Sequence, residues 1–189
     1  MKIGIFGAGH MGGAMIKGWL RSGSIAPEDV VVQGGRGTTA RLLQEELGFK
    51  LATNLTDFRS LDIIFLAVGT PLILPVLTDL HTALEGDILP IVSVSAGVPV
   101  KEMKKIVGAD HPIAQAIPNT PVQINEGMTG IVYGEFPEVE HKERMIKSFE
   151  ILGELMEITE DKIGIFGTLA GCGPAFVDVF MESLADGAV

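Results

Sequence analysis

The chain has 189 residues, of which 47% are hydrophobic, so it is long enough to bury a substantial core in one large domain or in one domain plus a fragment. Its formal net charge of −10 argues against nucleic acid or an anionic membrane as the main partner. Cys172 is the single cysteine, which excludes a disulfide within the chain and suits a reducing cytoplasm. The histidines lack metal-ligand spacing, and no apolar run reaches ~18 residues, so we expect neither a metal site nor a membrane-spanning helix.

The first feature with chemical meaning is a glycine motif at the start of the chain. A short apolar strand over residues 3–6 runs directly into Gly7-x-Gly9-x-x-Gly12, and a helical pattern follows over residues 10–22. In this setting the first glycine permits a tight turn, the second lets the main chain approach a pyrophosphate, and the third lets the helix pack close to the strand. The helix N-terminus directs N–H groups and partial positive charge at the phosphates. The motif predicts dinucleotide binding, and the alternative is a glycine-rich turn with a structural role only.

Apolar runs typical of strands then alternate with helical patterns. The second helix is expected over residues 38–47, with Thr38 or Thr39 as its N-cap and Gly48 as the residue that follows its C-terminus. The alternation predicts an α/β fold with a Rossmann-type, doubly wound, mainly parallel sheet. Strands are expected at residues 3–6, 30–33, 49–52, 62–68, 88–94, 112–117, 128–133 and 155–158, and helices at 10–22, 38–47, 71–84, 99–107 and 137–152.

The pattern changes after Thr159, where two helices are expected on either side of Gly171-Cys172-Gly173-Pro174. The second helix carries an apolar stripe that includes Phe176, Phe180 and Leu184. A stripe this rich must be covered by other protein. We therefore expect a second chain or a further C-terminal segment to cover it.

The end of the second strand indicates which dinucleotide binds. NAD sites usually place an acidic residue there, on the ribose 2′-OH. Here the strand ends in Gln33-Gly34-Gly35-Arg36, followed by Thr38 and Thr39, with no carboxylate. Arginine and bare amides suit a 2′-phosphate, so NADPH is expected in preference to NADH, which stays possible. The alternative for Arg36 is a solvated cation in a loop.

Other cofactor contacts are expected after the central strands, because ligands of open parallel sheets lie beyond the carboxyl ends of the strands. Ala67-Val68-Gly69-Thr70 is expected beside the dinucleotide, and Ser93-Val94-Ser95-Ala96-Gly97 near its nicotinamide end. Asn54 follows the third strand and has two interpretations of equal weight. It contacts the adenosine ribose, or it caps a helix over residues 55–59.

Taken together, several segments in order resemble the N-terminal two-thirds of the Δ1-pyrroline-5-carboxylate reductase family. They are Gly7-Ala8-Gly9-His10-Met11-Gly12, Ser93-Val94-Ser95-Ala96-Gly97-Val98, Pro118-Asn119-Thr120-Pro121, Glu126-Gly127-Met128-Thr129 and Gly171-Cys172-Gly173-Pro174-Ala175-Phe176. The resemblance covers essentially the whole chain. It implies NADPH-dependent hydride transfer to a cyclic imine, giving L-proline, in a cytoplasmic enzyme. It also implies an NADP-binding Rossmann domain at residues 1–159 and the truncated start of an all-helical dimerisation and substrate domain at residues 160–189, in a homodimer or larger homo-oligomer.

The resemblance also assigns residues. It implies a small cyclic imine as the substrate. It assigns residues that bind the cofactor and the substrate, but no catalytic side chain. Glu160 matches a glutamate near the substrate, and its alternative role is a favourable charge at a helix N-terminus. The implied cofactor contacts are Phe6, Gly7, Ala8, Gly9, His10, Met11, Gly34, Gly35, Arg36, Asn54, Ala67, Val68, Gly69, Thr70, Val94, Ser95 and Ala96.

One further site is open to two interpretations. The substrate carboxylate needs an anion site, and the helix that opens at Gly173-Pro174-Ala175 could supply one through its N-terminus. The simpler interpretation is that Gly171 and Gly173 allow close packing of helices.

The chain departs from the family pattern at three places. Gly69-Thr70-Pro71 stands where the family usually has Lys-Pro-Gln, and Gln115 stands where it usually has arginine. The family's Ser-Pro-Gly-Gly-Thr-Thr segment, which helps to form the imine site, is absent from these residues. The departures favour two alternatives: an NADP-dependent oxidoreductase acting on another imine or a 3-hydroxyacid, and a non-catalytic NADP-binding regulatory relative.

Overall fold

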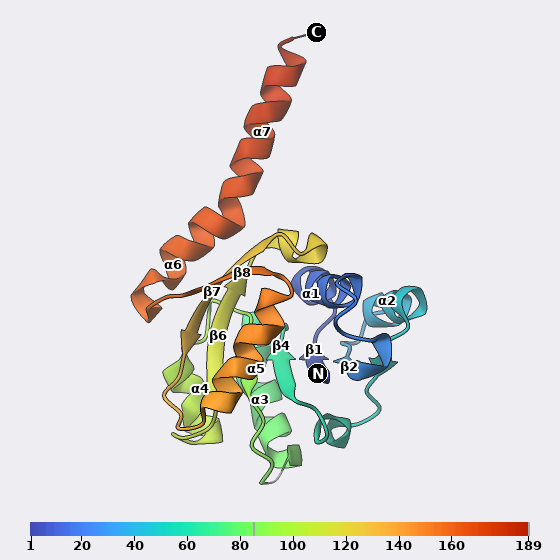
Figure 1. Ribbon diagram of the computed structural model, residues 1–189, viewed down its shortest axis with the longest axis vertical. Coiled ribbons are helices and arrows are strands. Elements are labelled where there is room, and N and C mark those ends of the chain that lie inside the picture. Colours follow the sequence, from blue (N-terminus) through green and yellow to red (C-terminus); the bar gives the residue numbers. More distant parts are fainter. Residues whose placement is uncertain (85, 189) are drawn as a thin grey trace.

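A mainly parallel sheet runs through the middle of the molecule in the computed structural model, which describes residues 1–84 and 86–188 (Figure 1). The strand order across these residues is β3-β2-β1-β4-β5-β6-β7-β8, and every neighbouring pair is parallel except β6 and β7. The strands are β1 (Ile3–Phe6), β2 (Val30–Gln33), β3 (Lys50–Leu51), β4 (Ile63–Leu66), β5 (Ile91–Ser93), β6 (Ile113–Pro118), β7 (Gly127–Tyr133) and β8 (Gly153–Glu157). The expected α/β fold with a doubly wound, mainly parallel sheet is therefore confirmed.

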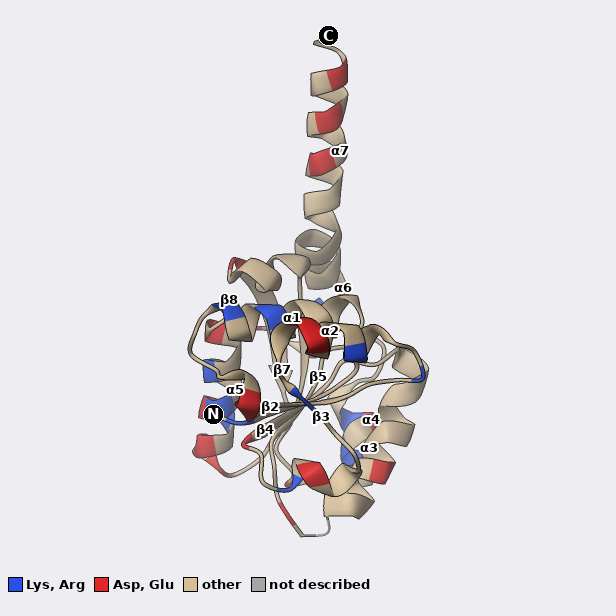
Figure 2. Ribbon diagram, turned by 90° about the vertical axis from the view of Figure 1, so that its right-hand side faces the viewer, with Lys and Arg blue, Asp and Glu red and all other residues tan. Residues whose placement is uncertain are grey.

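Helices cover both faces of this sheet (Figures 1 and 2). One face carries α1, α2 and α5, and the other carries α3, α4 and the short helix η2. The bounds of the helices before residue 159 are α1 (His10–Arg21), η1 (Pro27–Asp29), α2 (Thr39–Leu47), η2 (Leu55–Phe58), α3 (Thr70–Leu84), α4 (Val100–Val107), η3 (Thr120–Ile124) and α5 (Val139–Glu150). Gly48 ends α2 with a left-handed φ of 79°, as expected.

Two apolar cores lie on the two faces, because successive side chains of a strand point to opposite sides. Ile63 and Phe65 of β4 face the core under α1 and α5, whereas Ile64 and Leu66 face the core under α3 and α4. Strands buried on both faces need apolar residues at every position, which is why the sequence shows continuous apolar runs. Trp19 fixes α1 against α5, since its indole N–H donates to the Ser148 carbonyl at 2.8 Å.

The C-terminal segment corrects one expectation. Residues 160–186 form a continuous helical rod that bends part-way along and projects from the body, and the helix does not break at Gly171–Pro174 (Figure 1). Its parts are η4 (Glu160–Lys162), α6 (Ile163–Phe166), the π-helical turn η5 (Gly167–Cys172) and α7 (Gly173–Asp186). Pro174 lies in the first turn of α7, where the missing N–H costs little, and the wide π turn joins α6 to α7.

The rod also differs from the expectation that no membrane-spanning helix would be found. Within the described residues one helix, Glu160–Asp186, is long and apolar enough to cross a membrane by length and composition alone. The search for an unbroken apolar run missed it because Asp178 and Glu182 interrupt the run without ending the helix. Such a helix is weak evidence for a membrane, because exposed apolar surfaces also mark contacts between proteins.

Asn119 anchors the base of the rod to the sheet. Its Nδ2 donates to the Ala170 carbonyl in η5 at 3.1 Å, and its Oδ1 accepts from the Met128 N–H at 2.8 Å. A Cβ on Gly130 would lie 2.8 Å from the Phe166 ring, so β7 and α6 are in close contact. The rod is therefore attached at the carboxyl end of β6, the edge of the sheet at which the glycine loop also lies.

Candidate functional site

The glycine loop lies where the strand order reverses. β1 pairs with β2 on one side and with β4 on the other, so connections leave in opposite directions from this point. The Gly7 N–H donates to the Gln33 carbonyl at 2.9 Å, and the Ala67 N–H donates to the Phe6 carbonyl at 2.8 Å. In open parallel sheets, ligands bind in the crevice beyond the carboxyl ends at this switch point. The turn itself requires glycine, because φ at Gly7 is 98°.

Behind this turn, α1 approaches the strand ends very closely. A Cβ on Gly12 would lie 2.1 Å from the Gly7 carbonyl oxygen, so a side chain there would displace the helix. Gly9, in contrast, faces open space, since a Cβ added to it would meet no atom of the described residues within 4 Å. Gly9 caps α1 without a side-chain hydrogen bond, which leaves the first N–H groups of the helix free for an anion.

Two cavities flank the loop, with volumes of about 340 Å³ and about 240 Å³. Ala8, Gly9 and Thr39 line both of them. The larger is also lined by His10, Gly13, Ala14, Lys17, Leu43 and Gln123. The smaller is also lined by Gly7, Gly35, Gly37, Ala40, Val68, Gly69 and Leu72. The structure thus brings residues predicted from three separate loops, after β1, β2 and β4, to one place.

The loop after β2 closes one end of this region. A Cβ on Gly34 would lie 2.6 Å from the Ala40 Cβ, so glycine lets the loop pass against α2. Arg36 is exposed in this loop, and no Asp or Glu occurs between Val30 and Gln44. An exposed guanidinium without a neighbouring acid in the loop can bind the 2′-phosphate of NADP. Open space at Gly9, free helix N–H groups and Arg36 together fit a dinucleotide that carries this phosphate.

At the other end, the loops after β4 and β5 touch. Thr70 Oγ1 and Ser95 Oγ are 3.0 Å apart, and the Gln115 Nε2 donates to the Ser95 carbonyl at 2.7 Å. A Cβ on Gly97 would lie 2.3 Å from Thr70 Cγ2. Val94 is half-buried beside the core and Ala96 is exposed. The expected nicotinamide-side loop is therefore a closely packed, hydroxyl-lined edge.

Some predicted residues lie outside these cavities. Asn54 caps η2, since its Oδ1 accepts the Thr56 N–H at 2.9 Å and Asp57 completes a capping box. The Phe6 ring stacks on Phe58 with centroids 4.4 Å apart, so only its backbone can face a ligand. Glu160 is exposed in the first turn of the rod, where its charge suits the helix dipole. Met11 is half-buried in the first turn of α1.

Gly171 in η5 and Gly173 at the start of α7 correct both interpretations of that segment. A Cβ at Gly171 or Gly173 would meet no atom of the described residues within 4 Å, so the interpretation that they allow close helix packing is wrong within this chain. The rod continues through Gly173, so its N–H group lies inside a helix and not at a free N-terminus that could hold the substrate carboxylate.

We also searched the described residues for side chains that could bind a metal ion. Within residues 1–84 and 86–188, no group of three or more His, Cys, Asp or Glu side chains is arranged to hold a metal ion.

Sequence reasoning missed several residues that line the cavities, among them Lys17, Thr39, Leu72 and Gln123. Lys17 lies two turns after His10 on α1, and this spacing was the only signal in the sequence that could have indicated it. Gln123 comes from the distant helix η3, which packs against α1, so only the tertiary fold reveals it.

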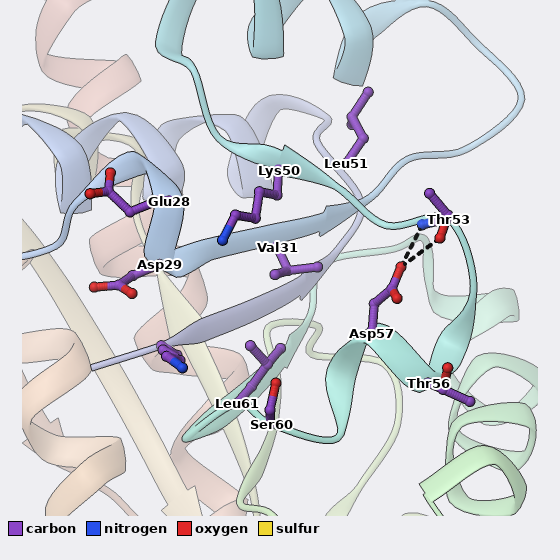
Figure 3. A pocket seen from close by; sticks show the side chains of 11 residues that line it. Glu28, Asp29, Val31, Lys50, Leu51, Thr53, Thr56, Asp57, Ser60 and Leu61 are labelled. Carbon is purple, nitrogen blue, oxygen red and sulfur yellow. Dashed lines mark hydrogen bonds between the residues drawn. The ribbon is translucent and has the colours of Figure 1, made fainter.

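A larger cavity, of about 740 Å³, lies elsewhere (Figure 3). Glu28 and Asp29, which precede β2, line one end of it, and Thr53, which follows β3, lines the other, so the cavity extends along these strands (Figure 3). Its charges are mixed in sign, and Asp57 is already bonded to Thr53 at its rim. Two backbone N–H groups, of Thr53 and Asn54, lower the pKa of the Asp57 carboxyl. Size alone does not make this cavity the candidate site, since ligands of such sheets bind in the crevice at the switch point, and no residue of the glycine loop lines this cavity.

Comparison with known proteins agrees with the geometry. Residues 2–97 match the family described as NADP oxidoreductase, coenzyme F420-dependent. The whole chain is 32% identical to the pyrroline-5-carboxylate reductase of Escherichia coli (strain K12) and spans 70% of that protein. The pyrroline carboxylate reductase of Plasmodium falciparum, solved with NADP bound, superimposes with a TM-score of 0.83 at 27% identity, over 100% of this chain and 69% of that one. The Coxiella burnetii enzyme superimposes with a TM-score of 0.87 at 25% identity, over 99% of this chain and 70% of that one. The chain belongs to the pyrroline-5-carboxylate reductase family of oxidoreductases.

Proposed function

We propose that this protein reduces 1-pyrroline-5-carboxylate to L-proline with NADPH, the last step of proline biosynthesis. The observation that carries the proposal is the glycine loop at the switch point, next to the acid-free loop that contains Arg36, in a chain of this family. NADH would bind in the same way but without a partner for Arg36. A reaction on another imine or on a 3-hydroxyacid is the second candidate function, because Gly69 and Gln115 replace the lysine and arginine that the family usually has.

The chain's own residues suggest how the cofactor would be held. The backbone at residues 6–11 and the free N–H groups of α1 would bind the pyrophosphate. Gly34, Gly35 and Arg36 would surround the phosphorylated ribose. The loop at 67–70 and the loop at 94–96 would lie along the nicotinamide half. Asn54 is proposed as a further contact through Nδ2, because its Oδ1 is engaged in the cap. One N–H of Nδ2 donates to Thr53 Oγ1 at 3.1 Å, and the second would face the ligand.

The reaction requires little acid–base chemistry from the protein. NADPH, when bound, would supply the hydride that reduces the imine carbon, and the ring nitrogen would take its proton from water. The chain's contribution is to fix the two reactants in contact and to exclude water from between them. Glu160, at the base of the rod, is proposed to lie near the substrate. No side chain is assigned a catalytic role.

The rod supports a proposal about assembly. Phe176, Phe180 and Leu184 are 70%, 63% and 59% exposed, so a large apolar surface faces outward. The same rod carries Asp178, Glu182 and Asp186 at four-residue spacing, visible as red bands on α7 in Figure 2. Three carboxylates in less than three turns would be costly inside a bilayer but not at the wet edge of a protein interface. We therefore propose that residues 160–189 belong to a helical dimerisation domain, that residues 1–159 form the NADP domain, and that the protein is a cytoplasmic homodimer or larger homo-oligomer.

A substrate panel tests the proposed reaction. The protein, as encoded by its gene, is assayed for NADPH oxidation with 1-pyrroline-5-carboxylate and a second cyclic imine, and for NADP⁺ reduction with 3-hydroxyacids. We expect turnover of 1-pyrroline-5-carboxylate with L-proline as the product. Turnover of another substrate alone would establish the second candidate reaction. NADPH binding without any turnover would instead indicate a non-catalytic, regulatory relative.

A further inference from the structure

The buried side chain of Gln115 lies beneath the loop at residues 94–96. Its contacts indicate how that loop is held for the cofactor, an inference that rests on the proposed function. Gln115 lies on β6 directly beside Ser93, the last residue of β5. Its side chain is 1% exposed, and its Nε2 donates to the Ser95 carbonyl at 2.7 Å. The bond therefore crosses from the interior of one strand to the loop that leaves the neighbouring strand.

The same loop is held from a second side. Ser95 Oγ lies 3.0 Å from Thr70 Oγ1, at the start of α3, and 3.4 Å from the donating Gly97 N–H. The backbone of Gly97 passes close to Thr70, since a Cβ on Gly97 would lie 2.8 Å from Thr70 Oγ1. Ser95 is thus fixed through its carbonyl by Gln115 and through its hydroxyl by Thr70.

Stability alone does not account for a glutamine at this position. Gln115 Oε1 and the adjacent Ser93 Oγ are both buried, and neither finds a hydrogen-bond partner among the described residues. A buried, unpaired amide oxygen costs free energy that an apolar side chain of the same size would not. The bond to Ser95 at best offsets this cost, so what the amide adds is a fixed position for the Ser95 backbone.

We propose that Gln115 is a positioning residue, which fixes the loop at residues 94–96 in the conformation that accepts the nicotinamide end of NADPH. The loop follows β5 at the carboxyl edge of the sheet, and the nicotinamide half extends along this edge when the pyrophosphate lies on the glycine loop. A loop that is already fixed loses little freedom when the ligand binds. The adenosine end is held separately, by the loop after β2, so Gln115 acts on one half of the ligand only.

Gln115→Met tests this role, because it removes the amide and nearly preserves the volume. Dissociation constants are measured for NADPH and for adenosine 2′,5′-bisphosphate, which has the phosphorylated ribose but no nicotinamide. We expect roughly tenfold weaker binding of NADPH and unchanged binding of the bisphosphate. Gln115→Glu keeps the shape but replaces the donor by an acceptor, and the same selective loss is expected. Gln115→Arg restores N–H donors and should recover part of the NADPH affinity.

Ser148→Ala is the matched control. It removes another buried bond from a side chain to the backbone, from Ser148 Oγ to the Met145 carbonyl at 2.6 Å, on a helix that lines neither cavity beside the glycine loop. Its affinity for both ligands should equal that of the unmodified protein. Equal weakening of both ligands by Gln115→Met, or no weakening, overturns the positioning role and leaves the proposed function intact. Failure of the unmodified protein to bind NADPH overturns both.

Discussion

Gly12 and Gly7 are in direct contact across the start of α1, so closely that a Cβ on Gly12 would lie 2.1 Å from the Gly7 carbonyl oxygen. The contact couples the position of the helix to the turn that begins the candidate site. Gly12→Ala should therefore displace α1, destabilise the fold by about 1–3 kcal/mol and abolish NADPH binding. Chemical unfolding and a binding titration on the same preparation check both effects.

Gly9→Ala separates binding from stability. Its new Cβ meets no atom of the described residues within 4 Å, and the Gly9 φ of −72° suits any residue. The variant should unfold like the unmodified protein but bind NADPH at least roughly tenfold more weakly, because the methyl group occupies the approach to the pyrophosphate. Full NADPH affinity in Gly9→Ala would show that the loop is structural only.

Arg36 should set the preference for NADPH over NADH. Removing its guanidinium in Arg36→Ala should weaken NADPH binding by roughly 10- to 100-fold and leave NADH binding unchanged, because only NADPH carries the 2′-phosphate. Arg21→Ala removes the same charge from the far end of α1 and serves as the control. If both variants lost the same NADPH affinity, Arg36 would act only through the overall charge of the protein and not by binding the 2′-phosphate.

The exposed stripe on α7 should drive self-association. Phe180→Asp places a charge in its middle, and light scattering should then report a smaller species than the unmodified protein forms. Binding of NADPH should persist, since α7 lines neither cavity beside the glycine loop. Asp178→Asn, on the acidic side of the same helix, should leave the assembly unchanged. A monomer before and after the Phe180 change would contradict the proposed interface.

His111 should make the fold sensitive to acid. Burial lowers the pKa of His111 from 6.5 to about 4, with smaller contributions from His81, His141 and Lys104, while a hydrogen bond to Leu89 opposes the shift. Because the unfolded chain then takes up the proton first, stability is lost as the pH falls from about 6.5 to about 4, at up to ~1.4 kcal/mol per pH unit. His111→Gln should remove this part of the slope in urea unfolding, whereas His10→Gln, at an exposed site, should not. Parallel slopes in all three proteins would contradict the assignment.

Much of the fold was predictable because strands buried on both faces leave an unambiguous apolar pattern. The switch point could also be located, since Gly7, Gly9 and Gly12 follow the first strand directly. The helix break expected before Pro174 was wrong because a π turn, which no local pattern indicates, joins α6 to α7. The cap at Asn54 could not be distinguished from a ligand contact by sequence alone, because both uses require the same side chain.

The environment of Gln115 shows the other limit of sequence reasoning. The sequence identified the residue only as a departure from the family pattern. Its partner, Ser95, is twenty positions away, and the bond exists because β5 and β6 are neighbours in the sheet. Pairing between strands, and not local sequence, therefore creates this part of the candidate site.

Titration of the unmodified protein with NADPH and with NADH tests whether the glycine loop and Arg36 together form an NADPH site. We expect saturable binding of NADPH at one site per chain, with NADH at least roughly tenfold weaker because it gives Arg36 no phosphate. Absence of NADPH binding, or tighter binding of NADH than of NADPH, would contradict the proposed NADPH site.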